Sequence, residues 1–296
     1  MPIRVITDST SYIPHEQLDA LGIRLVSLAV IYDGAPHREV EMDVPAFYEW
    51  LAHSGEFPTS SQPPAEEIVA AFTEAAEAGE DVLGVFLSSE MSGTFQAALL
   101  ARRMVLESHP DARIAVVDSR SNSLELGFAA LAGAEAAQAG AGLDASVDAV
   151  LAAMARTRFL FVPATLEYLR RGGRIGGASA LIGSLLQIRP ILTVADGRTE
   201  VLARVRTRRR ALEELLATMR ADVERYGLER VAVHHIADEA AGKALAEEVA
   251  GIAGREVEAY LLGPVVGLHV GPGTVGVVYQ TREAMREVGR EVVEGA

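Results

Sequence analysis

The chain has 296 residues, 49% of them hydrophobic and 23% charged, a composition typical of a globular protein long enough for two domains. Its 27 basic and 41 acidic residues give a net charge of −14, which opposes binding to nucleic acid and to anionic lipid surfaces. There is no cysteine and a single lysine, which excludes disulfides and thiolate chemistry and disfavours Schiff-base chemistry. No signal peptide or membrane-spanning run is recognisable, so we expect a cytoplasmic protein without stable membrane insertion.

The first half of the chain alternates short runs rich in branched residues with helical segments. Pro14, Asp43 and Pro64 stand where helices are expected to begin. The alanine-rich tract 129–142 is expected to form a tightly packed helix. The predicted strands are 3–7, 24–31, 82–87 and 114–117. Strands separated by helices in this way predict a parallel sheet with helices on both faces.

The second half has more strands and a hairpin signal. Ala-Asp-Gly-Arg at 195–198 favours a primed turn between antiparallel strands. The predicted strands are 159–162, 191–194, 199–205, 231–236, 256–262 and 275–280, and the predicted helices are 207–226 and 239–252. We therefore predict an α/β domain over 1–156 and an α+β domain with a mixed or antiparallel sheet over 157–296.

Hydroxyl-rich tracts follow three of the predicted parallel strands, at 8–11, 88–94 and 118–123, and a fourth tract at 58–63 precedes the helix that Pro64 opens. Ligands of parallel sheets bind beyond the carboxyl ends of the strands, and free N–H groups at the start of a helix favour an anion. Each tract alone is better explained as a helix cap. Their recurrence at one edge of a sheet favours a shared anion site.

Two glycine-rich tracts lie next to basic side chains. Gly271–Gly276 matches the dinucleotide-binding fingerprint, but a strand follows it, so we reject a cofactor loop there. It leaves a glycine-rich turn beside His269, from which the imidazole can point into a cleft or serve a structural role. Arg174 follows Gly172 and Gly173, where a helix is expected to end, and offers a guanidinium to a carboxylate or phosphate.

The other basic side chains suggest no cofactor or metal. His234 and His235 are adjacent on a strand and point to opposite faces, so we expect no metal site. Arg170 and Arg171 are expected to be surface charges. The arginine cluster over 204–210 is either a solvated face or a docking patch for an acidic partner of a regulatory module.

Several of these motifs occur together, in order, along essentially the whole chain. They are Asp8-Ser-Thr10, Thr59-Ser-Ser-Gln-Pro63, Ser88-Ser-x-x-Ser-Gly-Thr94, Val117-Asp-Ser119, Leu166-Glu-Tyr-Leu-x-x-Gly-Gly-Arg-Ile175 and Gly267-x-His-x-Gly-Pro-Gly273. In this the sequence resembles the DegV family of bacterial fatty-acid-binding proteins. The resemblance implies a two-domain fold with one long-chain fatty acid in the interdomain cleft, no cofactor and no catalytic residue.

The resemblance also implies which residues bind the ligand. The positions that hold the fatty-acid carboxylate in the family are occupied here by Ser60, Ser92, Arg174 and His269. The neighbouring hydroxyls are secondary candidates: Ser9, Ser61, Ser89 and Thr94. Ser60 stands where a threonine is usual, which keeps the hydroxyl.

Some relatives present the acyl carboxylate to a separate ATP-dependent fatty-acid kinase, which makes an acyl phosphate for phospholipid synthesis. The resemblance therefore implies such a kinase as a partner. Gly176-Gly177 stands where a lysine is often found, which weakens the transfer of that docking role to this chain.

The acyl chain would supply most of the affinity, because about 14 buried methylenes contribute on the order of 11 kcal/mol before the costs of association. The candidate tail-binding segments are 181–186 and 159–162, for which filled core is the alternative. An alternative of another class is a phosphotransferase or hydrolase that uses Ser92 and His269 on a small anionic substrate.

Overall fold

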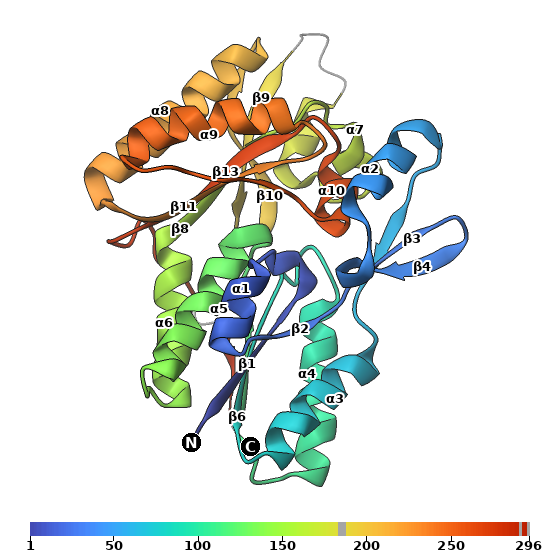
Figure 1. Ribbon diagram of the computed structural model, residues 1–296, viewed down its shortest axis with the longest axis vertical. Coiled ribbons are helices and arrows are strands. Elements are labelled where there is room, and N and C mark those ends of the chain that lie inside the picture. The colour runs from blue at the N-terminus through green and yellow to red at the C-terminus, as the bar shows by residue number, and fades with distance from the viewer. Residues whose placement is uncertain (183–187, 290–291, 295–296) are drawn as a thin grey trace. The chain divides into compact units, whose positions relative to one another are not determined.

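The computed structural model describes residues 1–182, 188–289 and 292–294 (Figure 1). The chain forms two compact units. Unit 1 comprises Met1–Glu41, Ser60–Ala155 and Glu287–Ala296, and unit 2 comprises Met42–Thr59 and Arg156–Arg286. The chain passes from unit 1 to unit 2 between Ala155 and Arg156. The segment Met42–Thr59 packs with unit 2. The predicted contiguous ranges, 1–156 and 157–296, place this segment in the first domain instead.

Unit 1 contains the predicted parallel sheet, in the order β14-β7-β6-β1-β2. β1 pairs in parallel with β2 and β6, and β6 pairs in parallel with β7, whereas β14 is antiparallel to β7. The strands are β1 (Ile3–Asp8), β2 (Arg24–Val26), β6 (Asp81–Phe86), β7 (Ile114–Asp118) and β14 (Val292–Val293). The carboxyl ends of β1, β6 and β7 therefore lie at one edge of the sheet, and the hydroxyl tracts that follow these strands begin at that edge.

The prediction of a single strand over 24–31 was wrong, because this segment forms two separate strands. β2 ends at Val26, and β3 (Ala29–Tyr32) leaves the parallel sheet to form a three-stranded sheet of order β4-β3-β5 with β4 (Ala35–Arg38) and β5 (Thr59–Ser61). At the break, Ser9 Oγ accepts a hydrogen bond from the Leu28 N–H (3.1 Å), a contact with a distant residue that no local pattern signals.

The helices of unit 1 cover both faces of its parallel sheet. In Figure 1, α1 and α5 lie on one side of β1 and β6, and α3 and α4 lie on the other. They are α1 (His15–Leu21), α3 (Ala65–Glu77), α4 (Thr94–Ser108), α5 (Ser123–Gln138) and α6 (Leu143–Arg156), with short 3-10 helices η1 (Ser9–Ser11) and η2 (Glu39–Glu41). The alanine-rich tract lies largely in α5. A β-carbon at Gly133 would be 2.9 Å from Leu83 and 2.7 Å from Val150, so glycine permits close packing against β6 and α6.

Unit 2 contains a six-stranded mixed sheet, in the order β10-β9-β8-β13-β11-β12. All neighbours are antiparallel except β11 and β12, which are parallel. The strands are β8 (Thr157–Val162), β9 (Arg189–Ala195), β10 (Arg198–Val205), β11 (Leu228–His235), β12 (Ala259–Leu261) and β13 (Val275–Thr281). Asp196 and Gly197 join β9 to β10 with φ of 48° and 79°, which confirms the primed turn.

Two long helices, α8 (Arg208–Tyr226) and α9 (Glu239–Ala253), pack on one face of this sheet. Leu160 and Val277 are fully buried in the core that they form with Leu215. The remaining helices are α2 (Val44–His53), α7 (Glu167–Arg171), η3 (Gly176–Leu181) and α10 (Pro264–Val270).

The segment that contains α2 is attached to unit 2 by the Tyr48 hydroxyl. This hydroxyl donates to the carbonyls of Leu262 (2.8 Å) and Gly263 (3.0 Å), immediately before α10. A β-carbon at Gly267 would overlap the Tyr48 hydroxyl, so glycine is needed where α10 meets α2. These contacts explain why residues that follow η2 of unit 1 in the sequence pack with unit 2.

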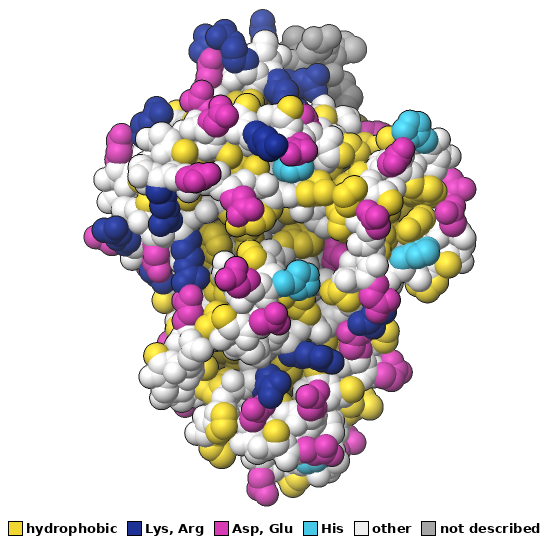
Figure 2. All heavy atoms as spheres, viewed as in Figure 1, with side chains coloured by type: hydrophobic (Ala, Val, Ile, Leu, Met, Phe, Trp, Pro, Cys, Tyr) yellow, Lys and Arg dark blue, Asp and Glu magenta, His cyan; other side chains and the backbone are white. Residues whose placement is uncertain are grey.

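The surface carries charges of both signs. On the face shown in Figure 2, basic side chains lie among the acidic ones over both units. In the described part of the chain, no helix is long and apolar enough to cross a membrane.

Candidate functional site

Two buried aspartates fasten the hydroxyl tracts of unit 1 to one another. Asp8, at the end of β1, accepts hydrogen bonds from the Thr10 N–H (3.0 Å) and from the Leu87 N–H (2.8 Å) at the end of β6. Asp118, at the end of β7, accepts from the Ser89 N–H (3.3 Å) and the Arg120 N–H (2.9 Å). Burial raises the pKa of Asp8 to about 6, although the hydrogen bonds from Thr10 and Leu87 lower it. The aspartates of these motifs therefore fix the loops.

Ser92 lies in the loop that leads into α4. Its Oγ is 2.9 Å from Thr94 Oγ1 and accepts from the Thr94 N–H at 3.3 Å. A β-carbon at Gly93 would overlap the Gln62 Oε1, so the tract that holds Ser60 and the Ser-Gly-Thr tract are in contact within unit 1. The structure thus brings together two of the predicted hydroxyl tracts, with Ser60 and Ser92 both partly exposed.

The secondary candidates differ in how much of their hydrogen-bonding capacity is used inside the protein. Ser9 is buried, and its Oγ donates to Glu39 at 2.5 Å while accepting from Leu28 at 3.1 Å. Its hydroxyl proton is therefore committed to Glu39. Thr94 is fully buried beside Ser92, whereas Ser61 and Ser89 are partly exposed.

In unit 2, Arg174 and His269 both contact Gly172 closely. α7 ends at Arg171, and the Arg174 guanidinium donates from Nη1 to the Gly172 carbonyl at 2.6 Å. A β-carbon at Gly172 would overlap the His269 Nδ1, which shows how closely the imidazole approaches this glycine. Burial, together with the positive charge of Arg174, lowers the pKa of His269 to about 4, so the ring is neutral at pH 7.

The expected glycine-rich turn does lie beside His269, but it follows a short helix that the sequence did not indicate. His269 is in the last turn of α10, and the glycines follow it. Pro264 is the first residue of this helix, and Gly267, in its middle, packs tightly against the Tyr48 hydroxyl. A seven-residue helix between glycines has too little periodicity to be recognised from sequence.

An aromatic stack that the sequence did not indicate supports α7. The Arg171 guanidinium lies 4.2 Å from the centre of the Phe57 ring, and that ring is 5.9 Å from the ring of Tyr168. A β-carbon at Gly271 would overlap the Tyr168 ring. Arg171 is thus exposed but stacked on an aromatic ring. Arg170, in the contacts described, forms an ion pair with exposed Glu167 (2.6 Å), as expected of a surface charge.

The residues of one candidate tail-binding segment, 159–162, fall on two faces of the unit 2 sheet. Leu160 and Val162 belong to the core under α8 and α9, so they cannot line a ligand site without unpacking it. Phe159 and Phe161 point to the opposite face and are 4.9 Å apart between ring centres. In the segment 181–186, Leu181 is buried and Ile182 is exposed, and residues 183–186 lie outside the described residues.

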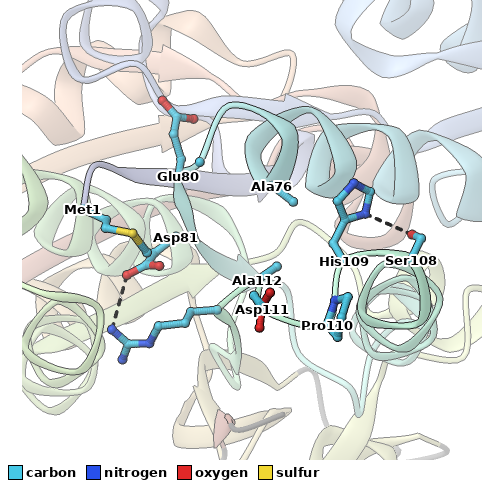
Figure 3. Close-up of a pocket in the computed structure, with 11 residues that line it drawn as sticks. Met1, Ala76, Glu80, Asp81, Ser108, His109, Pro110, Asp111 and Ala112 are labelled. Atoms are coloured by element: carbon cyan, nitrogen blue, oxygen red, sulfur yellow. Dashed lines mark hydrogen bonds and ion pairs between the residues drawn. The ribbon is translucent and has the colours of Figure 1, made fainter.

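A cavity of about 390 Å³ lies at the other edge of the unit 1 sheet (Figure 3). It is lined by Asp81 at the amino end of β6 and by residues 108–113 after α4. Arg113 on its wall bonds to Asp81 (3.4 Å) and Asp144 (2.9 Å). Because the hydroxyl tracts follow the carboxyl ends of the strands, this cavity is separate from them.

The remaining basic candidates are accounted for by local contacts. His234 packs edge-on against Phe159 and His235 against Gly242 of α9, which confirms that they face opposite ways. Among residues the structure describes, no group of three or more His, Cys, Asp or Glu side chains is placed to hold a metal ion.

The arginine cluster over 204–210 is partly paired with neighbouring groups. Arg208 donates to the Gly273 carbonyl (2.8 Å) and lies 3.4 Å from Asp238. Arg209 and Arg210 both contact Glu213, at 3.4 and 3.5 Å. These ion pairs agree with the solvated-face interpretation.

Comparison with known proteins first identifies the class of fold. A solved DegV family protein from Thermus thermophilus, described as fatty-acid binding, is 37% identical, with a TM-score of 0.85 over 95% of this chain and 100% of that one. DegV of Bacillus subtilis, described as a fatty acid binding protein, is 33% identical, with a TM-score of 0.86 over 95% of this chain and 99% of that one. The mixed α/β fold is therefore that of the DegV structures.

The family follows from the sequence comparison. The family described as "Uncharacterised protein, DegV family" matches residues 2–282. A DegV domain-containing protein of Clostridium acetobutylicum is 43% identical, over 97% of this chain and 100% of its own length. The chain belongs to the DegV family.

Proposed function

We propose that this protein binds a long-chain fatty acid and holds its carboxylate with Ser60 and Ser92 of unit 1 and Arg174 and His269 of unit 2. The observation that carries the proposal is the arrangement around Gly172. A guanidinium and a neutral imidazole lie beside the same glycine, in a family that includes the two solved proteins above described as fatty-acid binding.

The chemistry of these groups suits a carboxylate. A carboxylate removed from water needs hydrogen-bond donors and a compensating positive charge, because an unpaired buried charge is costly. The hydroxyls and the imidazole can donate, and Arg174 supplies the charge. Arg174 is partly exposed, and its guanidinium donates to the Gly172 carbonyl.

The acyl chain would lie against apolar side chains of unit 2. Phe159 and Phe161 are also buried but lie outside the core under α8 and α9, and they are the candidates that remain. Two rings on one sheet face bury a large apolar area and suit contact with methylene groups.

The proposal extends to a partner. A carrier of this kind would present the carboxylate to a separate ATP-dependent kinase, which forms the acyl phosphate for phospholipid synthesis, and would supply no catalytic residue itself.

Lipid extraction of the purified protein tests the binding. Mass spectrometry of an organic extract is expected to show long-chain fatty acid in amounts near one per protein, and delipidated protein is expected to bind palmitate again. An empty protein that does not take up palmitate would overturn the proposal, and turnover of an ester or a phosphoryl donor would favour an enzyme instead. The kinase step is tested separately, by adding a purified fatty-acid kinase with ATP and measuring acyl phosphate.

A further inference from the structure

The loop between β7 and α5 contains the only asparagine of the chain, Asn122. Asn122 precedes the first turn of α5, where asparagine normally accepts a hydrogen bond from a free N–H of the helix. Its side chain makes no such capping bond. The usual reason for an asparagine at this position therefore does not apply.

The Asn122 carboxamide is instead directed at the loop that carries Ser92. Its Nδ2 donates to the Met91 Sδ at 3.1 Å, and Met91 is the residue before Ser92. The two loops are also joined through the backbone, because the Ser88 N–H donates to the Ser121 carbonyl at 2.8 Å. Asn122 thus belongs to the same hydroxyl-rich edge of unit 1 as Ser92.

The protein around Asn122 satisfies its side chain poorly. The residue is 8% exposed, and its Oδ1 is buried without a hydrogen-bond partner. A thioether is a weak acceptor, so the bond to Met91 compensates little. A buried polar atom left unsatisfied reduces stability, and such atoms are uncommon in folded proteins unless they serve a function.

The backbone around Asn122 is strained as well. Arg120 and Ser123 have φ of 53° and 58°, a left-handed conformation that residues other than glycine seldom adopt. Backbone strain of this kind concentrates at binding and active sites, where the surrounding structure enforces it. The strain is maintained here by Asp118, which accepts the Arg120 N–H at 2.9 Å.

We propose that Asn122 is a further ligand-binding residue of this protein. When the fatty acid binds, the Asn122 carboxamide gives up its hydrogen bond to the Met91 sulfur and donates to the carboxylate instead. A carboxylate oxygen is a much stronger acceptor than a thioether sulfur, so the exchange is favourable. This inference rests on the proposed function, since it requires the fatty-acid carboxylate to lie near Ser92.

The single asparagine provides a direct spectroscopic test. Protein made with side-chain ¹⁵N-labelled asparagine gives the signals of one side-chain NH2 group, a pair of protons on one nitrogen, which NMR follows during titration with palmitate. The expected result is a downfield shift of one amide proton with palmitate and a smaller change with palmityl alcohol, which lacks the carboxylate. Palmitate that binds without moving the signal more than the alcohol does would overturn the inference and leave the proposed function intact. Absence of palmitate binding would overturn both.

A variant pair tests the same inference by affinity. Asn122→Ala is expected to weaken palmitate binding about tenfold and palmityl alcohol binding less than about twofold, as loss of one hydrogen bond to a charged group predicts. Gln138→Ala removes the carboxamide at the other end of α5 and is the matched control, expected to leave both affinities unchanged. An equal loss for acid and alcohol in Asn122→Ala would indicate a packing role and overturn the inference. If Asn122→Ala does not fold, the NMR titration of the unaltered protein decides.

Discussion

Gly172 offers a substitution that separates ligand binding from stability. Its φ of −75° and ψ of −7° suit any residue, so Gly172→Ala causes no backbone strain, but the added β-carbon would overlap the His269 Nδ1. Nonbonded atoms of this kind pack at about 3.5 Å, so the imidazole must move by on the order of 1 Å. A displacement of that size breaks a hydrogen bond to a bound carboxylate.

The expected effect follows from the energy of that hydrogen bond. A hydrogen bond to a charged group contributes about 1.5–3 kcal/mol, so palmitate affinity is expected to fall by roughly tenfold to a hundredfold. The unfolding free energy is expected to change by less than about 1 kcal/mol, because alanine favours helical backbone more than glycine does. Titration calorimetry with palmitate measures the affinity, and urea unfolding measures the stability.

Gly173 is the matched control. It has φ of +71° and open space around its missing side chain, so Gly173→Ala strains the backbone without touching His269. Its stability is expected to fall by about 1 kcal/mol while palmitate affinity is retained. The reasoning would be refuted if Gly172→Ala bound palmitate as tightly as the unaltered protein, or if Gly173→Ala lost the same affinity.

Three further predictions concern charge, pH and the attachment of α2. Arg174→Ala should weaken palmitate retention about tenfold or more, whereas Arg170→Ala, which removes only an exposed partner of Glu167, should not, and equal effects in lipid extraction would contradict the site. Burial lowers the pKa of His234 to about 3, below its ordinary 6.5, so this group stabilises the fold fully above pH 6.5 and less as the pH falls toward 3. Urea unfolding at pH 7 and 4.5 should show about 2 kcal/mol more acid destabilisation in the unaltered protein than in His234→Phe, and identical pH dependence would argue against this assignment. Tyr48→Phe removes the hydroxyl that bonds to Leu262 and Gly263 and should lower the unfolding free energy by about 1–2 kcal/mol, so an unchanged urea midpoint would show that the bond contributes nothing.

Local patterns in the sequence determined much of the secondary structure and the location of the hydroxyl tracts. The hairpin at Asp196-Gly197 and the helix starts at Asp43 and Pro64 depend on a few neighbouring residues, and the structure confirms them. The family motifs were also recognisable from sequence, because their residue types and spacing are linear properties of the chain.

Contacts between distant residues decided what the sequence left open. Met42–Thr59 packs with unit 2 because the Tyr48 hydroxyl reaches carbonyls more than 200 positions away, and no local signal encodes that bond. Likewise, the approach of His269 to Gly172 and the non-capping orientation of Asn122 depend on side chains that folding brings together. Chain neighbours fix backbone conformation, but only tertiary packing determines which side chains share a site.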